Sequence, residues 1–219
     1  TYYGSELDFD PDSALPDLDL SLVDGVEVYN KGDSVSVITE QNIIAWFNVL
    51  NHGYHIAAIG GSDEHHFAGS YGNPRNLVPS SRTVEEGVDQ TEIWDNVKAL
   101  RSQVVGGPVI RFSVDDKGSG ETVVANEGKV TVKVKVEAPK WMGLNFVKVF
   151  ANGIQANEFV PTENSEVVRL DETFELELET DAHIVVTAGS FDPAHEMVPV
   201  ARKLPFSNTN PIFVDVDGD

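Results

Sequence analysis

The run KVTVKVKVEA constrains the fold most, because valine occupies every second position from Val130 to Val136 and lysine or threonine lies between. Successive side chains of a strand point to opposite faces, so this period of two predicts a strand with one buried and one solvated face. The segments FVKVFANG, ETFELELET and HIVVTAGS repeat the theme, separated by turn residues such as Asn152-Gly153. Several short strands without a helical pattern predict an all-β sandwich over residues 109–219.

The pattern before Gly106-Gly-Pro108 is different. TEQNIIAWFNVLNHG places apolar residues at helical spacing, with Thr39 as the expected cap and Gly53 as the stop. HIAAIGG is a short apolar strand, and TVEEGVDQTEIWDNVKALRSQ contains a second helical face. With VDGVEVYN as an earlier strand, the order is typical of an α/β unit with parallel strands. We therefore predict two domains, 1–108 and 109–219.

The charge of the chain excludes several classes of function. Fifteen basic against 36 acidic residues give a formal net charge of −21, which repels nucleic acid and anionic membranes. No apolar run approaches the roughly 18–20 residues of a membrane span. The absence of cysteine excludes disulfides and thiolate metal sites. The acidity suits cation binding, and it favours a periplasmic, secreted or halophilic setting over an ordinary cytosol without deciding the compartment.

The segment AAIGGSDEHH is the strongest candidate for a functional site. Reactive groups of parallel α/β folds lie at the carboxyl ends of strands, and Asp63 and His65 come directly after one. In an extended segment, residues two apart point to the same side, so both side chains can reach one pocket. A carboxylate with an imidazole suits Zn²⁺, Mn²⁺ or Fe²⁺. The alternative is that Asp63 caps a turn and His65 is solvated.

Two further residues strengthen the prediction of a site. Glu27 lies among valines in GVEVYN, where a carboxylate is costly unless it is paired, metal-bound or turned to solvent on an edge strand. Arg75 lies in GNPRN, and its guanidinium is suited to clamp an anionic substrate group, although a surface salt bridge explains it nearly as well. His52 and His55 are better explained as surface or capping histidines, and we assign no role to His66.

The series DGVEVYN, LNHGYHIAAIGGSDEHH, YGNPRNLV and AL…GGPVI resembles the C-terminal half of a PHP-domain metallohydrolase (polymerase and histidinol phosphatase type), most closely the CehA/McbA subgroup. The resemblance covers most of residues 20–112, and the NTNPIFVD ending of the tail is similar too. It implies a partial (β/α) barrel followed by the β-sandwich. It also implies a phosphoesterase, or a hydrolase of carbamate, amide or ester bonds, that acts on a small molecule.

Carried over by position, the resemblance makes Asp63 and His65 metal ligands and Glu27 a strand-end acid that lines the metal site. Asp63 would also orient the attacking water, with Arg75 holding negative charge. The family's D-x-H-x-H motif is absent, as are its middle acid and histidine ligands. We therefore expect an incomplete barrel, inactive alone, that associates with its missing N-terminal half or with another copy.

Two rival functions remain open. The acidic run of Asp215, Asp217 and Asp219 could start a Ca²⁺ loop, which would suit a non-catalytic extracellular binding or interaction module. Trp141 is a candidate aromatic platform for such a module. The other rival is an inactive scaffold that is related to the enzymes and binds no metal.

Overall fold

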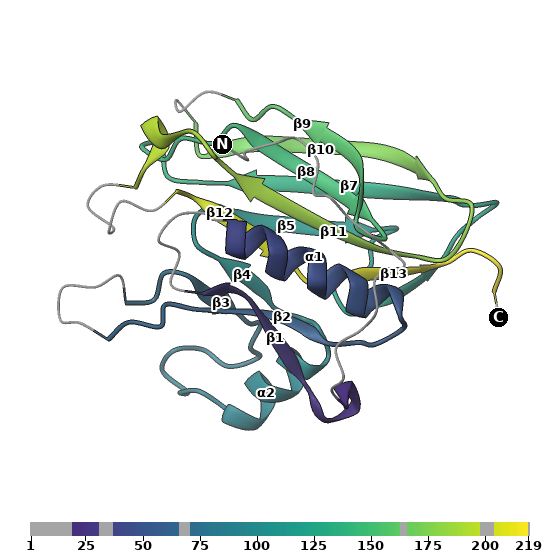
Figure 1. Ribbon diagram of the computed structural model, residues 1–219, viewed down its shortest axis with the longest axis horizontal. Helices are drawn as coiled ribbons and strands as arrows, with labels where there is room; N and C mark the ends of the chain where they lie inside the picture. The colour runs from purple at the N-terminus through teal and green to yellow at the C-terminus, as the bar shows by residue number, and fades with distance from the viewer. Residues whose placement is uncertain (1–18, 31–36, 66–70, 163–165, 198–203, 219) are drawn as a thin grey trace.

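The computed structural model describes residues 19–30, 37–65, 71–162, 166–197 and 204–218 (Figure 1). Within these ranges, two α-helices, two short 3-10 helices and thirteen strands follow one another along the chain. The first part contains a 3-10 helix (Leu20–Leu22), β1 (Gly25–Asn30), α1 (Val37–Asn51), β2 (Ala57–Gly61), β3 (Arg75–Leu77), α2 (Gln90–Lys98) and β4 (Gln103–Val105). The second part contains β5 (Val109–Val114), β6 (Thr122–Val124), β7 (Lys129–Glu137), β8 (Phe146–Ala151), β9 (Ile154–Phe159), β10 (Val168–Glu177), β11 (Ala182–Gly189), a 3-10 helix (Pro193–His195), β12 (Phe206–Thr209) and β13 (Ile212–Asp215).

The alternation in KVTVKVKVEA is confirmed by β7, whose four valines are buried while Lys129, Thr131 and Lys133 are exposed. β7 lies between the antiparallel strands β5 and β10 in a three-stranded sheet. The inner face of this sheet packs against an eight-stranded sheet, and the valines share one core with β8, β11 and β13. This packing of one sheet on the other forms the sandwich.

The eight-stranded sheet joins the two parts of the chain. Its order is β3-β4-β12-β11-β13-β6, with β8 added beside β11 and β9 beside β8. β3 and β4 precede residue 108, yet β4 pairs directly with β12 near the chain end, Val105 lying opposite Ser207. The first part of the chain is therefore built into the same sheet as the second. Whether the two parts fold independently of each other, with a domain boundary near residue 108, stays a prediction.

Helix α1 lies across the other face of the large sheet, together with the parallel pair β1–β2 (Figure 1). Trp46 and Phe47 of α1 are fully buried, and the Trp46 indole N–H donates to the carbonyl of Ile56 at 2.8 Å. The predicted stop at Gly53 is confirmed, because Gly53 adopts φ +81 and its N–H bonds to the carbonyl of Leu50. The predicted cap at Thr39 is wrong, since the helix already begins at Val37.

The prediction of a PHP-type partial (β/α) barrel is wrong for the described residues. They are mostly strands, and β1–α1–β2 is the one strand–helix–strand unit among them that pairs its two strands in parallel as a barrel wall would. After β2 the chain does not continue the parallel series, because β3 and β4 pair antiparallel and enter the large sheet. The apolar segments VDGVEVYN and HIAAIGG are strands and pair with each other as predicted, whereas β4 pairs with β12 of the second part of the chain.

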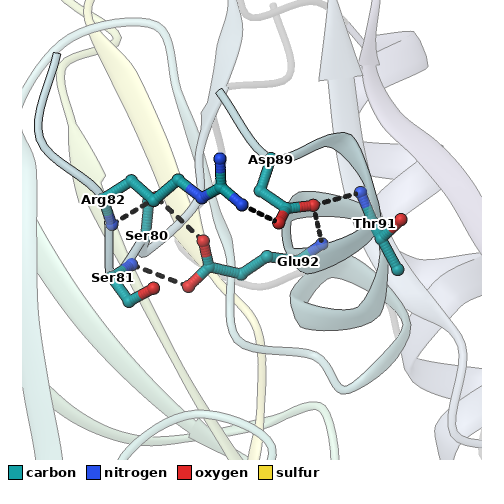
Figure 2. A network of polar contacts seen from close by, with 6 residues as sticks. All are labelled: Ser80, Ser81, Arg82, Asp89, Thr91 and Glu92. Atoms are coloured by element: carbon teal, nitrogen blue, oxygen red, sulfur yellow. Dashed lines mark hydrogen bonds and ion pairs between the residues drawn. The ribbon is translucent and has the colours of Figure 1, made fainter. Parts of the chain in front are cut away.

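Helix α2 begins in a network of polar contacts shown in Figure 2. The Asp89 carboxylate accepts hydrogen bonds from the N–H groups of Thr91 and Glu92 and pairs with Arg82 at 2.6 Å. The Glu92 carboxylate accepts from the Ser81 N–H at 2.7 Å. These backbone contacts lower the pKa of Asp89 and of Glu92, so both carboxylates stay ionised to a lower pH than is usual for these groups. Neither helix of the described chain is long and apolar enough to cross a membrane.

Candidate functional site

The carboxyl ends of β1 and β2 lie side by side, because the two strands pair in parallel with Asn30 opposite Gly61. The Asn76 side chain on β3 fixes the end of β2: its amide donates to the Gly60 carbonyl at 2.8 Å and its oxygen accepts from the Gly60 N–H at 2.9 Å. Gly60 leaves no room for a side chain, since a Cβ there would lie 2.5 Å from Val104. The strand end that carries the candidate site is therefore held firmly.

Asp63 and His65 lie in contact just beyond this strand end. His65 Nε2 is 2.8 Å from Asp63 Oδ1, and the His65 and Asp63 side chains are 69% and 44% exposed, respectively. The geometry differs from the extended segment that the sequence suggests, because Asp63 adopts φ +43 in the left-handed region that aspartate tolerates better than most residues. An exposed ion pair of this kind contributes little to the free energy of folding. The stability of the fold therefore does not explain why Asp63 and His65 lie together.

Glu27 reaches the same strand end from β1. A Cβ on Gly61 would lie 2.7 Å from Glu27 Oε1, so the carboxylate covers the Gly61 backbone two residues before Asp63. Its second oxygen accepts from the Asn30 amide at 2.7 Å. Glu27 is exposed. Its carboxylate therefore faces solvent and is not buried among the neighbouring valines, so the cost of burying a charge does not arise.

Arg75 opens β3 and is exposed, and its guanidinium donates to the Gly72 carbonyl at 3.3 Å. Its neighbour Asn76 holds Gly60, so Arg75 lies one residue from the contact that anchors the strand end. No carboxylate of the described residues pairs with Arg75, which differs from the surface salt bridge that the sequence allowed. Among the described residues, the guanidinium therefore keeps donors for another group.

Within the described ranges, Asp181, Asp215 and Asp217 are the one set of three acidic or histidine ligands whose atoms all lie within 4.8 Å of one another. Glu27, Asp63 and His65 thus do not form a compact three-ligand set here. Asp215 and Asp217 belong to the predicted Ca²⁺ run, Asp219 lies outside the described residues, and Asp181 directly precedes β11. Asp181 and Asp215 already accept backbone N–H groups, from Val216 and Gly218 respectively.

The remaining histidines of the candidate window have ordinary positions. His52 Nδ1 lies 2.8 Å from the carbonyl of Asn48, so it caps the end of α1. His55 is exposed and stacks on Phe213, with ring centroids 4.1 Å apart. His66 lies outside the described residues.

A second histidine site was missed by sequence reasoning. His183 on β11 is 4% exposed and lies at the edge of an open groove of about 560 Å³ between the end of α1 and the large sheet. Its Nε2 lies 2.6 Å from Asn51 Oδ1, its ring stacks on Phe47, and its Nδ1 has no hydrogen-bond partner among the described residues. Burial lowers the pKa of His183 to about 4, so the ring is neutral at pH 7. The histidine inside the apolar run HIVVTAG was the available signal.

Comparison of the chain with protein-family models and with curated proteins finds no match to either. The functional assignment therefore rests on the residues and contacts described above.

Proposed function

We propose that the chain is part of a metal-dependent hydrolase whose site lies at the carboxyl ends of β1 and β2. The observation that carries the proposal is the contact between His65 Nε2 and Asp63 Oδ1 at the end of a strand fixed by Asn76. The pair is accessible to solvent, and it joins the donor types that Zn²⁺, Mn²⁺ and Fe²⁺ accept. The resemblance to PHP-type enzymes supports the same reaction class, without the barrel.

The donors fit a divalent ion in kind and in access. Asp63 and His65 would hold it, and the exposed Glu27 carboxylate, which lies over Gly61, could add a third ligand after a side-chain rotation. A bound divalent ion lowers the pKa of its water toward neutrality and so supplies a nucleophile at working pH. Arg75 would bind the anionic part of a phosphoester or carboxyl substrate, because the residues that the structure describes use only one of its donors. Asp63 would also orient the attacking water.

The test is calorimetric titration of metal-free protein with Mn²⁺ and with Zn²⁺. We expect Asp63→Asn and His65→Ala each to weaken binding at least tenfold, because each removes one of few ligands. Asp217→Asn is the matched control, since it removes one exposed carboxylate from the other acidic group. Hydrolysis of p-nitrophenyl phosphate and p-nitrophenyl acetate with added Mn²⁺ gives the second readout. Unchanged affinity and turnover in Asp63→Asn would contradict the proposal.

The same titration, extended to Ca²⁺, separates the rival functions. A Ca²⁺-binding module is favoured by one observation, the gathering of Asp181, Asp215 and Asp217. It predicts Ca²⁺ binding that is lost in Asp217→Asn and retained in Asp63→Asn. An inactive scaffold predicts no binding of any of the three ions.

A further inference from the structure

We propose that a groove at the junction of β4 and β5 binds the oxyanion of a small, partly apolar organic anion through Arg101 and Arg111. The groove has a volume of about 450 Å³. Its walls come from both parts of the chain, and they include the apolar side chains of Leu77, Val109 and Phe112. This site is distinct from the strand end around Asp63, and the proposal does not depend on the hydrolase function.

The Gln103 side chain brings the two arginines to one groove. Its amide donates to the carbonyl of Ile110 at 3.0 Å, and its oxygen accepts from the Ile110 N–H at 3.1 Å. This double contact holds the start of β4 beside β5. Arg101 lies two residues before Gln103 and Arg111 directly follows Ile110, and both line the groove.

The backbone of Arg101 is fixed by the end of α2. Its N–H donates to the carbonyl of Asn96 at 2.9 Å, and the preceding Leu100 is buried in a left-handed conformation, φ +61. The turn after β5 packs tightly on this helix end, since a Cβ on Gly120 would lie 1.9 Å from the carbonyl oxygen of Ala99. The guanidinium of Arg101 therefore extends from a rigid base.

Donors of both guanidinium groups remain unused among the described residues. Arg101 donates no side-chain hydrogen bond there, and Arg111 uses its Nε–H in an ion pair with Glu137 at 2.9 Å, which leaves its two terminal nitrogens as donors. Glu121 is the one acidic residue among the described residues that line the groove. Its carboxylate accepts a hydrogen bond from the Gly118 N–H at 2.7 Å and lies 3.4 Å from Lys117 Nζ. These contacts and the charge of Arg101 lower the pKa of Glu121.

Two guanidinium groups that line one groove are suited to bind an oxyanion. Each guanidinium presents paired N–H donors that match carboxylate or phosphate, and the bonds are charge-assisted. The formal charge of −21 repels anions over the rest of the surface, so a local pair of arginines with free donors would concentrate anion binding in this groove. The apolar walls select a ligand with a hydrocarbon or aromatic body.

The test is calorimetric titration of the full chain with phenyl phosphate in 0.15 M NaCl and EDTA. Benzoate, inorganic phosphate and phenol are the companion probes. We expect phenyl phosphate or benzoate to bind at least tenfold more tightly than phenol, because phenol lacks the oxyanion. Inorganic phosphate should bind more weakly than phenyl phosphate, because it lacks the apolar body. Comparison of phenyl phosphate with benzoate then identifies the preferred oxyanion.

Variants locate the binding. Arg101→Gln and Arg111→Gln should each raise the dissociation constant at least tenfold, and Arg101→Lys should give an intermediate value because it keeps the charge but loses the planar fork. Lys140→Gln, an exposed lysine elsewhere, makes the same charge change and should bind within twofold of wild type. Because EDTA removes divalent ions, binding that persists in it does not require the proposed metal site at Asp63 and His65.

Two results would overturn the proposal. One is wild-type affinity in both arginine variants, with unchanged circular dichroism spectra to show that they fold. The other is an equal loss of binding in Lys140→Gln, which would mean that overall charge, not the groove, controls binding.

Discussion

At the scale of single residues, His183 is a buried histidine whose pKa is far below its ordinary value. Its ring is enclosed by Phe47 and by the large sheet, and no acceptor of the described residues faces its Nδ1. Protonation would place a charge and an unsatisfied N–H in an apolar setting, which explains why burial lowers its pKa from 6.5 to about 4. The unfolded chain therefore takes up this proton at a higher pH than the folded chain.

The stability of the protein should consequently fall as the pH drops from about 6.5 to about 4. Above pH 6.5 both states are neutral at His183 and its contribution is constant, whereas at pH 5 the loss from this residue is about 2 kcal/mol. His183→Phe keeps a ring against Phe47 and removes the proton. We expect it to flatten the dependence of the free energy of unfolding on pH between 5 and 7, measured by urea denaturation.

His55→Gln is the control for this prediction, because His55 is exposed and lies on the same groove. It should leave the pH dependence unchanged. A slope in His183→Phe equal to that of wild type would show that His183 is not the group that takes up the proton.

Contacts between side chains close in the sequence were predictable, and distant ones were not. The proximity of Asp63 and His65 follows from their spacing, and the contact is present although the backbone is not extended. The bond between His183 and Asn51 joins residues 132 apart. No local pattern encodes it, because it depends on how α1 lies across the sheet. The proximity of Asp181 to Asp215 was not predictable either, because it also depends on how distant segments of the chain pack.

At the scale of elements, the helices and strands whose apolar residues repeat with a clear period were predicted correctly. β7 was predictable because its valines are all on one buried face, and α1 because its apolar residues recur at helical spacing. β3 and β4 have three residues each, too few for a period to appear. They are strands because β12 supplies hydrogen-bond partners to β4, and β12 is about 100 residues away along the chain.

Gly120 is the residue on which the contact between the β5–β6 connection and α2 depends. It adopts φ +83, and a Cβ would lie 1.9 Å from the Ala99 carbonyl oxygen, a backbone atom that cannot move alone. Gly120→Ala should therefore cost about 3 kcal/mol or more in the free energy of unfolding, since it adds a collision to the strain of the left-handed conformation.

Gly87→Ala is the matched control for Gly120→Ala. Gly87 has a similar φ of +78, but no atom of the described residues lies within 4 Å of its added Cβ. It should cost only about 1 kcal/mol, the strain of the conformation itself. Equal losses in the two variants, measured by urea denaturation, would show that the contact with α2 contributes nothing.

At the scale of the whole molecule, the barrel prediction failed because a sequence pattern identifies a strand but not its neighbour. The parallel unit β1–α1–β2 is present, as the pattern indicated. Beyond β2 the chain departs from a barrel, because β3 and β4 extend the large sheet that the second part of the chain provides. The core around α1 includes Phe150, Val185 and Phe206 of that sheet, so the two parts share buried surface.

This shared core leads to a prediction about unfolding. Trp46 is fully buried in it, whereas Trp94 and Trp141 are 53% and 60% exposed. In a variant carrying Trp94→Phe and Trp141→Phe, fluorescence reports on Trp46 and hence on the α1 layer, while far-ultraviolet circular dichroism reports mainly on the strands. We expect both signals to change at the same urea concentration, because unfolding α1 would expose one face of the large sheet and β3 and β4 are part of it. A Trp46 transition at lower urea that leaves the strand signal intact would instead show that the first part unfolds alone, and it would support an independent domain ending near residue 108.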